Sequence, residues 1–544
     1  MANGSLLALG LAMVVNSQRT DEMASEELVS SAARGDVVSP DWIHGALLVL
    51  VGAVLAFTLE SGPGTLDSAK FAFLGHTGGT PHATGYPGYL MALGLFSHVF
   101  RVGTLAVRAN AFSAICLLFA LSLTYRMFLR LGVHRMVAAL CLVTFAVVAP
   151  VWSQSVVAEV YTFALVFIAG IGLLAVRVLQ DEHPQDVVLL CLVYSLSFGA
   201  HLVSVMFLPA IGFVLGRWAW RRRESPATLG RVAAAGLAMV LVGVAQYGYL
   251  FVVTALDRPY LESPVSSLAD LWRVVTGGQF TGQLFGLSLA QVVDERVPML
   301  VESIGGSWML LVFATAAGLA VARNRFGVFF ALSALGNLGF VLGYAIFDIE
   351  SYLLPMHWFV AVFTGFGIHH LLRLDTDSST RRVAGLALAL FLVPSVLFAM
   401  NLGEIRSAQV AARNERVPDA VRQVGTSAVV VAGGGTIADS TRFELWAYEL
   451  IGNRKGAKHN IWLSYAPGPA AIANYLQFGT AMPAELGSYR NSDGSGASVT
   501  HAELPTGMEV FVVDEGLIPG LKANGMNVEL VDPDLRLWTV TLLA

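Results

Sequence analysis

The chain has few charged residues for its length. Of its 544 residues, 13% are charged and 55% are hydrophobic, and its mean hydropathy is +0.66. An ordinary soluble domain carries about 25% charged residues, so the composition excludes a wholly soluble protein. It predicts a polytopic α-helical membrane protein.

Cysteine and lysine are also scarce. The three cysteines, Cys116, Cys141 and Cys191, lie in apolar runs, which excludes a disulfide framework in the polar segments. There are few lysines beside many arginines, and the net charge is −5, so we predict no nucleic-acid partner. The bias toward arginine and alanine favours a bacterial origin and therefore a plasma (inner) membrane location.

Apolar runs able to cross a hydrocarbon core of about 30 Å fill residues 42–400. Residues 1–41 hold an apolar run too short to span and lack the basic region of a secretory signal, so we expect a cytoplasmic tail there. We expect about eleven spans, with 187–198 and 202–215 counted as two. They are 43–59, 109–123, 136–150, 156–175, 187–198, 202–215, 232–253, 299–321, 326–346, 353–372 and 383–399.

The run 88–100 is about half the length of a span, follows Pro87 and ends at Arg101, which is typical of a helix lying at the membrane interface. With that helix flat and the N-terminus inside, most arginines fall in inner loops, as the positive-inside rule expects. An outside N-terminus with 88–100 spanning would satisfy the later loops equally well, so length decides between the two.

This topology predicts three segments on the outer face: a first loop at 61–104, a long loop at 254–298 and the C-terminal part, 401–544. In the last, hydropathy falls and short β-like runs appear at 427–432, 460–465 and 508–514. They predict a soluble α/β domain. Its glycine-rich stretch after the first run, at 433–436, is more typical of a turn than of a phosphate loop.

Several chemically active side chains are predicted on the outer face. Asp67 lies in the first loop with His76 and His82, although an aspartate there could simply cap a helix over 68–74. Glu159 lies at the outer end of a span, where an acid is a candidate functional group. His201 and Asp348 lie at outer ends too, and each alone could serve only to end a helix.

In order along the chain, these motifs resemble the domain of unknown function 2723 family. The matching residues are Asp67, His82 with Gly85-Tyr86-Pro87, Trp152-Ser153-Gln154 with Ala158-Glu159-Val160-Tyr161, Gly199 to Leu202, and Tyr344, Asp348, Tyr352 and Pro355. That family is similar to the GT-C membrane glycosyltransferases, and its eukaryotic branch includes a protein O-mannosyltransferase. Where its members usually have two prolines after the histidine, this chain has Ala83-Thr84, which puts the stiffness of the loop in doubt.

The resemblance implies a GT-C-like transmembrane domain over 42–400. It also implies an inverting transfer of a mannose-like hexose from a polyprenyl-phosphate donor to a protein or glycan acceptor on the extracytoplasmic face. Asp67 would be the general base. The predicted substrate-binding residues are His82, Tyr86, Glu159, Tyr161, His201, Arg258, Asp348 and Tyr352. Arg258 is favoured for the phosphate over Arg273, Lys70, Arg101 and His201.

Other classes stay open at this point. A divalent metal held by Asp67, His76, His82 and Glu159 is an alternative, but the ligand spacing is not tight, and we assign no metal ligand. A transporter or lipid flippase would also be polytopic, although its ionisable groups usually lie near the bilayer midplane. A receptor or scaffold built on the outer domain would leave Asp67 without a role.

Overall fold

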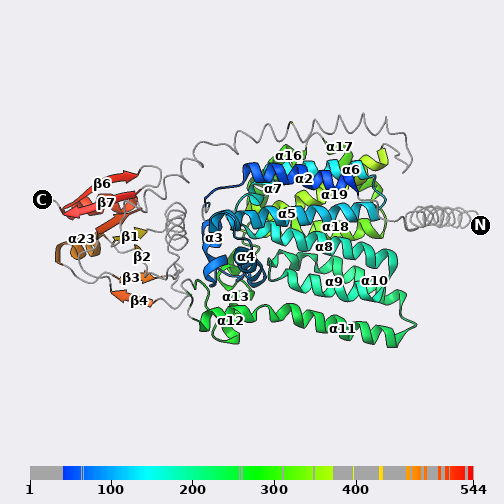
Figure 1. Ribbon diagram of the computed structural model, residues 1–544, viewed down its shortest axis with the longest axis horizontal. Coiled ribbons are helices and arrows are strands. Elements are labelled where there is room, and N and C mark those ends of the chain that lie inside the picture. The colour runs from blue at the N-terminus through cyan, green and yellow to red at the C-terminus, as the bar shows by residue number, and fades with distance from the viewer. Residues whose placement is uncertain are drawn as a thin grey trace, which may run out of the picture.

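The computed structural model describes residues 41–371 apart from 63, 65–66, 257, 259–260, 309–310 and 347–348, together with residue 396. It also describes 428–432, 461–465, 469–478, 483–486, 500–503, 509–513, 515–532 and 537–542. Helices dominate the first part and strands the second (Figure 1).

The first half of the helical part begins at Trp42. Its elements are α2 (Trp42–Thr58), α3 (Asp67–Thr77), α4 (Pro87–Val99), α5 (Leu105–Arg130), α6 (Arg135–Val147), α7 (Ala149–Ser155), α8 (Val160–Asp181), α9 (Pro184–Ser197), η1 (Leu202–Phe207), α10 (Leu208–Arg221), α11 (Pro226–Ala245) and α12 (Gly248–Ala255).

The second half contains shorter elements before two long helices. These are α13 (Leu268–Val275), η2 (Gly278–Gln283), α14 (Leu289–Gln291), η3 (Val292–Arg296), α15 (Val297–Leu300), η4 (Val301–Gly305), α16 (Gly306–Trp308), α17 (Val312–Val321), α18 (Arg325–Gly343), η6 (Ile349–Leu353) and α19 (Leu354–Leu371).

Within the described residues, six helical runs are long and apolar enough to cross a membrane, and a bent pair would make seven. The runs are α5, α8, η1 with α10, α11 with α12, α18, and η6 with α19. Helices α2 and α9 are apolar but shorter. The chain is therefore a multi-pass membrane protein, while the count of about eleven spans stays a prediction because the predicted span 383–399 lies outside the described residues.

Two predicted spans contain more than one helical element. The run 136–150 is divided between α6 and α7, which meet at an angle of 73°, because Val148 leaves helical geometry and Pro150 opens the next helix. Residues 151–155, which lie between two of the predicted spans, are consequently part of helix α7. The run 299–321 comprises α15, η4, α16 and α17, with residues 309–310 outside the described residues, so the span predicted there stays a prediction.

Helices α3 and α4 lie across one end of the bundle, whereas α5, α8 and α11 run along it (Figure 1). Pro87 occupies the first turn of α4, where its missing N–H costs no hydrogen bond. The prediction of a separate, non-spanning helix at 88–100 agrees with this arrangement, since α4 is not among the candidate spans.

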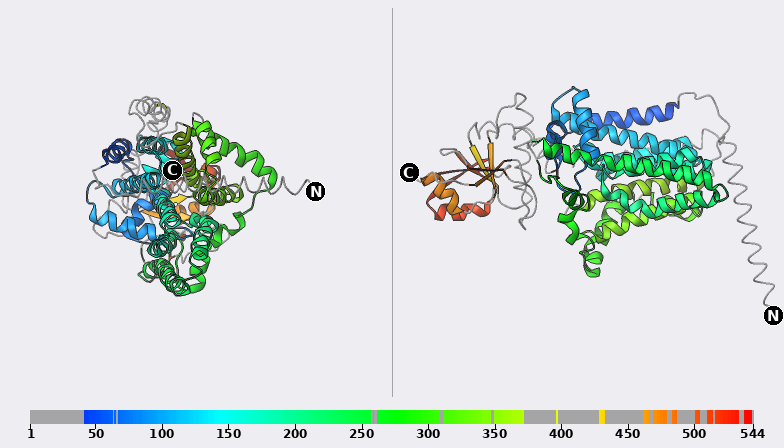
Figure 2. Two further views of the ribbon diagram at one scale, coloured as in Figure 1. Left: turned by 90° about the vertical axis from the view of Figure 1, so that its right-hand side faces the viewer. Right: turned by 90° about the horizontal axis from the view of Figure 1, so that it is seen from below.

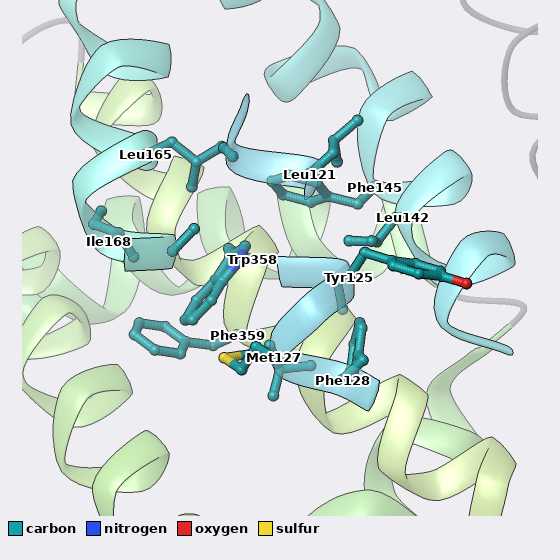
Figure 3. Packing of buried hydrophobic residues seen from close by; sticks show 14 of the residues in the cluster. Leu121, Tyr125, Met127, Phe128, Leu142, Phe145, Leu165, Ile168, Trp358 and Phe359 are labelled. Carbon is teal, nitrogen blue, oxygen red and sulfur yellow. The ribbon is translucent and has the colours of Figure 1, made fainter. Parts of the chain in front are cut away.

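The bundle core is built from large aromatic and aliphatic side chains of α5, α6, α8 and α19 (Figure 3). Trp358 is 1% exposed, and its indole N–H donates to Thr124 Oγ1 at 2.9 Å. Gly172 faces this indole so closely that an added Cβ would lie 2.9 Å from the ring. A tightly packed bundle with its polar atoms paired is what a low-dielectric setting requires.

The C-terminal strands form one mixed sheet. Its strands are β1 (Ala428–Ala432), β2 (Ile461–Tyr465), β3 (Pro483–Leu486), β4 (Thr500–Glu503), β5 (Glu509–Val512), β6 (Met526–Asp532) and β7 (Leu537–Leu542). The order is β4-β3-β2-β1-β5-β7-β6, with β1 parallel to β2 and to β5 and the other pairs antiparallel.

Three of these strands, β1, β2 and β5, coincide with the runs predicted at 427–432, 460–465 and 508–514. Helices α23 (Pro469–Phe478) and α24 (Ile518–Ala523) accompany the sheet. The sheet lies beyond the end of the bundle that carries α3 and α4 (Figures 1 and 2). The domain boundary at 401 stays a prediction, and the glycine-rich stretch 433–436 lies outside the described residues.

Candidate functional site

The candidate site is a polar network at the α3 end of the bundle. Asp67 is the first residue of α3, and one turn later comes Lys70. The Lys70 Nζ lies 2.9 Å from Asp67 Oδ1, with side-chain exposures of 3% for the lysine and 36% for the aspartate. The lysine is therefore enclosed, while the carboxylate remains open to a ligand.

The electrostatics of this pair keep Asp67 ionised. Burial, the largest single effect, would raise the pKa of Asp67, but the charge and hydrogen bond of Lys70 together with His82 outweigh it and hold the pKa below its usual value. Burial likewise disfavours the charged lysine, yet Asp67 and Glu262 together raise the pKa of Lys70 above its usual value. At neutral pH the site thus contains a carboxylate that can accept a proton.

Lys70 has two further partners. Its Nζ donates to Glu262 Oε2 at 3.0 Å and lies 3.0 Å from His82 Nδ1. An ammonium has three N–H donors and no acceptor, so these partners together with Asp67 use all three. His82 Nδ1 must accept, which places the proton of the neutral imidazole on Nε2.

That proton faces Tyr86. His82 Nε2 lies 3.0 Å from Tyr86 Oη and 3.7 Å from Asp67 Oδ2. Tyr86 is buried and takes a left-handed backbone conformation with φ of 39°, which is uncommon for a residue with a side chain and is often found at functional sites. The network fixes the orientation of His82 and Tyr86 beside the carboxylate.

Two loops distant in sequence are joined beneath this network. Glu262 N–H donates to Thr80 O at 2.8 Å, and Ser263 N–H donates to Thr80 Oγ1 at 3.0 Å. Tyr249 adds contacts at 3.3 Å and 3.2 Å to the backbone of Gly79. The segment at 261–263 is thereby attached to the segment at 79–80.

On the other side of Tyr86 lies an aromatic cluster around His201. The His201 ring stacks on Tyr86 at 5.6 Å between centroids and contacts Tyr161 at 5.5 Å and Tyr352 at 5.1 Å. Its Nδ1 accepts from Val203 N–H at 3.1 Å. Its Nε2 is buried and has no hydrogen-bond partner among the described residues.

This nitrogen belongs to a residue that lines a small cavity. The cavity volume is about 10 Å³, room for the centre of roughly one water. Burial lowers the pKa of His201 to about 3, so the imidazole is neutral and Nε2 can accept a hydrogen bond. The lining comprises Tyr161, Ala164, Leu165, Ile168, His201, Val203, Tyr352, Leu354 and Pro355.

The turn that presents His201 depends on Gly199. Its carbonyl accepts from Tyr89 N–H of α4 at 3.1 Å, and a Cβ at this position would lie 1.7 Å from Gln246 Oε1. Only glycine fits so close an approach. This accounts physically for the Gly-x-His-Leu pattern seen in the sequence.

Glu159 contacts the same helix as Asp67 from a different direction. It precedes α8, and its Oε1 accepts from Ser68 Oγ at 2.9 Å. Its backbone N–H donates to Ser113 Oγ at 3.2 Å. The predicted position at the end of a helix is confirmed, since Glu159 immediately precedes α8, and the contact with Ser68 attaches the start of α3 to α8.

Arg258 lies apart from the carboxylate. Its side chain is exposed and borders Gly78, at the far end of α3 from Asp67. It is also near enough to Tyr249 to affect the electrostatics of that hydroxyl group. Asp348 lies outside the described residues, so its predicted binding role is a prediction only.

The alternative metal site is not assembled. Across the described parts of the chain, no group of three or more His, Cys, Asp or Glu side chains could hold a metal ion. His76 is exposed and stacks on His98 at 5.0 Å instead of joining His82. Glu159 reaches Asp67 only indirectly, through its neighbour Ser68.

Sequence reasoning missed Glu262 altogether and assigned Lys70 only as a candidate phosphate ligand. Glu262 is one of five acids in the predicted loop 254–298, and nothing in the local sequence distinguishes it from the other four. Its partner is 192 residues away, a separation that no local pattern reveals.

The fold defines the class. A structure of ArnT from Cupriavidus metallidurans bound to undecaprenyl phosphate aligns with a TM-score of 0.58 and 12% identity, covering 92% of this chain and 98% of that one. ArnT from the same organism in the apo state aligns with a TM-score of 0.50 and 12% identity, covering 91% and 97%. The chain shares the fold of these two ArnT structures.

Sequence similarity is more specific over part of the chain. Residues 67–224 match the family described as the N-terminal domain of protein O-mannosyl-transferase TMEM260. The matched segment begins at Asp67 and includes His82, Tyr86, Glu159 and His201. The chain therefore shares its fold with ArnT, and within it residues 67–224 are similar to a protein O-mannosyl-transferase domain. No curated protein matches it in sequence.

Proposed function

We propose that the protein is a membrane glycosyltransferase that moves a mannose-like hexose from a polyprenyl-phosphate donor to a hydroxyl group of a protein or glycan. The observation that carries this proposal is the Asp67 carboxylate, ionised and partly open, at the first residue of the segment that matches an O-mannosyl-transferase domain. The undecaprenyl phosphate bound by ArnT supports a lipid-linked donor.

The reaction follows from the roles of the site residues. The acceptor oxygen attacks the anomeric carbon as the bond from that carbon to the phosphate oxygen breaks, which inverts the configuration. The hydroxyl proton passes to the Asp67 carboxylate, and polyprenyl phosphate leaves. A general base placed in this way contributes roughly 10²- to 10⁴-fold to the rate.

We assign the donor sugar to the aromatic cluster, whose cavity of about 10 Å³ must widen to admit a hexose. Tyr161 and Tyr352 supply aromatic rings. Nε2 of His201, which has no hydrogen-bond partner among the described residues, can accept from a sugar hydroxyl. Tyr86 contacts this cluster through its ring and the Asp67 network through its hydroxyl group, so it joins the sugar pocket to the base.

The phosphate needs a cation that is free to bind it. Lys70 uses its three donors within the protein, so we assign the donor phosphate to Arg258, as its sequence position suggested. Its side chain borders Gly78, just beyond the C-terminal end of α3. A planar guanidinium can hold two phosphate oxygens at once.

The activity is tested with the purified full-length protein and undecaprenyl-phosphate-linked mannose labelled in the sugar. A threonine-containing peptide and a mannosyl oligosaccharide serve as alternative acceptors. We expect label to pass to one of them, with release of undecaprenyl phosphate, and Asp67→Asn to abolish the transfer. Asp294→Asn, an exposed aspartate on η3, is the matched control.

Two results would contradict the proposal. Near-normal transfer by Asp67→Asn would remove the general-base role. Movement of the intact lipid-linked sugar across a liposome bilayer, without transfer to any acceptor, would instead identify a flippase.

The proposed extracytoplasmic location of the site has its own test. Single cysteines replacing Ser61 and Ser440 in a cysteine-free background should both react with an impermeant thiol reagent added to intact cells. Reaction at only one of them would place residues 61–104 and 401–544 on opposite sides of the membrane.

A further inference from the structure

Lys70 stands out among the cations of the site because it is enclosed and has carboxylates on two sides. It is 2% exposed, and its Nζ lies 2.9 Å from Asp67 on its own helix and 3.0 Å from Glu262 on the long loop. Glu262 is buried as well. A buried charge is tolerated only when it is paired, so each of these groups depends on the other.

The same lysine joins two segments that backbone contacts already bring together. Residues Thr80 and Leu261 form a parallel bridge, and the N–H groups of Glu262 and Ser263 donate to Thr80. The Lys70–Glu262 pair adds a charge-assisted bond to this attachment, and such bonds are stronger than neutral ones.

We propose that Lys70 is a positioning residue that clamps the long loop, through Glu262, onto the helix carrying the Asp67 base, and that it does not bind the donor phosphate. This rests on the function proposed above. It assigns Lys70 a role in holding the base and the loop in one arrangement before any substrate binds.

Three features of the geometry support this role over phosphate binding. The three N–H donors of the ammonium are already used, by Asp67, His82 and Glu262. The side chain is closed to solvent, whereas the Arg258 side chain is exposed. Moving Lys70 to a phosphate would leave Glu262 buried without its charged partner, which is strongly unfavourable.

The clamp also sets the charge around the base. The charged and titratable groups around Asp67 include Lys70 on its own helix, His82 and Tyr86 from the following segment, Glu262 from the long loop, and Glu159 through Ser68. Lys70 is the lysine among them and lies closest to the carboxylate. Removing it should raise the pH at which Asp67 becomes protonated.

The test uses the full-length protein with three variants. Lys70→Met removes the ammonium next to Glu262, whereas Lys70→Met/Glu262→Gln removes both buried charges and keeps similar volumes. Lys522→Met, at an exposed lysine of α24, is the control. The readouts are hydrogen exchange of the Glu262 and Ser263 amides, binding of undecaprenyl phosphate, and the pH profile of transfer.

We expect amide exchange at 262–263 to be at least about tenfold faster in Lys70→Met and to return toward wild type in the double variant. The dissociation constant of the double variant for undecaprenyl phosphate should be within about twofold of the wild-type value. Loss of one strong contact to the phosphate would instead raise it about tenfold. The acid limb of the pH profile should shift upward by about one pH unit in both variants, because an adjacent opposite charge has been removed.

Each readout can overturn the proposal. Unchanged exchange in Lys70→Met would remove the clamp, and binding weakened tenfold or more in the double variant would make Lys70 a phosphate ligand. If the acid limb of the pH profile does not shift, Lys70 does not influence the protonation of Asp67. If wild type transfers no sugar, the proposed function fails, but exchange and lipid binding still decide whether the clamp exists.

Discussion

The two sides of Tyr86 differ in how their polar atoms are satisfied. On the Asp67 side, Lys70 and His82 bind one another and the carboxylates, so the network is complete without a ligand. On the His201 side, aromatic rings surround a buried nitrogen that has no partner among the described residues. One side is already organised, and the other has an acceptor available.

This difference indicates how the work is divided. A reacting group must be held before the substrate arrives, because preorganised charges cost no rearrangement during the reaction. A binding pocket gains affinity when a ligand satisfies a buried polar atom that otherwise has no partner. The Asp67 side therefore suits the chemical step, and the His201 side suits recognition of the donor.

The strongest test of this division is Asp67→Asn. Asparagine keeps the size and one acceptor oxygen for Lys70 but has little basicity, so turnover should fall about 10²- to 10⁴-fold. The dissociation constant for undecaprenyl phosphate should change by less than about threefold. Rates are measured by sugar transfer and binding by titration. If rate and affinity fall in parallel, Asp67 contributes to donor binding and not to the chemical step.

A smaller effect is expected at Arg258. Arg258→Ala removes a charge-assisted contact to phosphate, and because the side chain is exposed the loss should be near the lower end of 1.5 to 3 kcal/mol, or about tenfold in affinity. The effect should shrink as salt rises from 0.05 to about 0.5 M because of screening. Arg273→Ala, an exposed arginine paired with Asp270, is the control, and an equal loss there would indicate a general charge effect.

At His201 the change should appear in KM. His201→Phe keeps an aromatic ring but removes the acceptor nitrogen, so KM for the lipid-linked sugar should rise about fivefold while kcat falls by less than twofold. His76→Phe replaces an exposed histidine and should leave KM unchanged. A fall in kcat with KM unaltered would move His201 to the catalytic side.

The smallest expected effect concerns how the stability of the folded protein depends on pH. The pKa of His201 is about 3 in the folded protein and 6.5 in the unfolded chain. The unfolded chain therefore binds the extra proton as pH falls below 6.5, and the contribution of His201 to stability is lost in that direction. Thermal unfolding midpoints at pH 7.5 and 5 should differ more for wild type than for His201→Phe, and an equal difference would mean that His201 is hydrated.

The bundle was largely predictable from the sequence because hydrocarbon thickness fixes the length of an apolar run. The bend at Val148 was not, since a run of apolar residues looks the same whether it is straight or bent. Strands β1, β2 and β5 of the C-terminal part were found because parallel strands are continuous apolar runs, whereas the longer antiparallel strands β6 and β7 were not.

The site was predictable to the extent that its residues are close in sequence or unusual in type. Asp67, His82 and Tyr86 lie within 20 positions of one another in a polar segment, and His201 follows a glycine that its turn requires. The pairing of Lys70 with Glu262 depends on two loops meeting after the bundle has formed. Arg258 was named from its position, but its exposure could not be known.

Helix α7 has a mechanical consequence for the bundle. Trp152 donates to Thr58 Oγ1 of α2 at 2.9 Å, Gln154 donates to Ser351 Oγ of η6 at 3.3 Å, and Val156 O accepts from Glu60 N–H at 3.1 Å. Helix α7 lies at 73° to α6, and its side chains link it to α2 and to η6. A lipid tail that passed between α7 and either of these elements would have to break these bonds, so the bundle resists opening on this side.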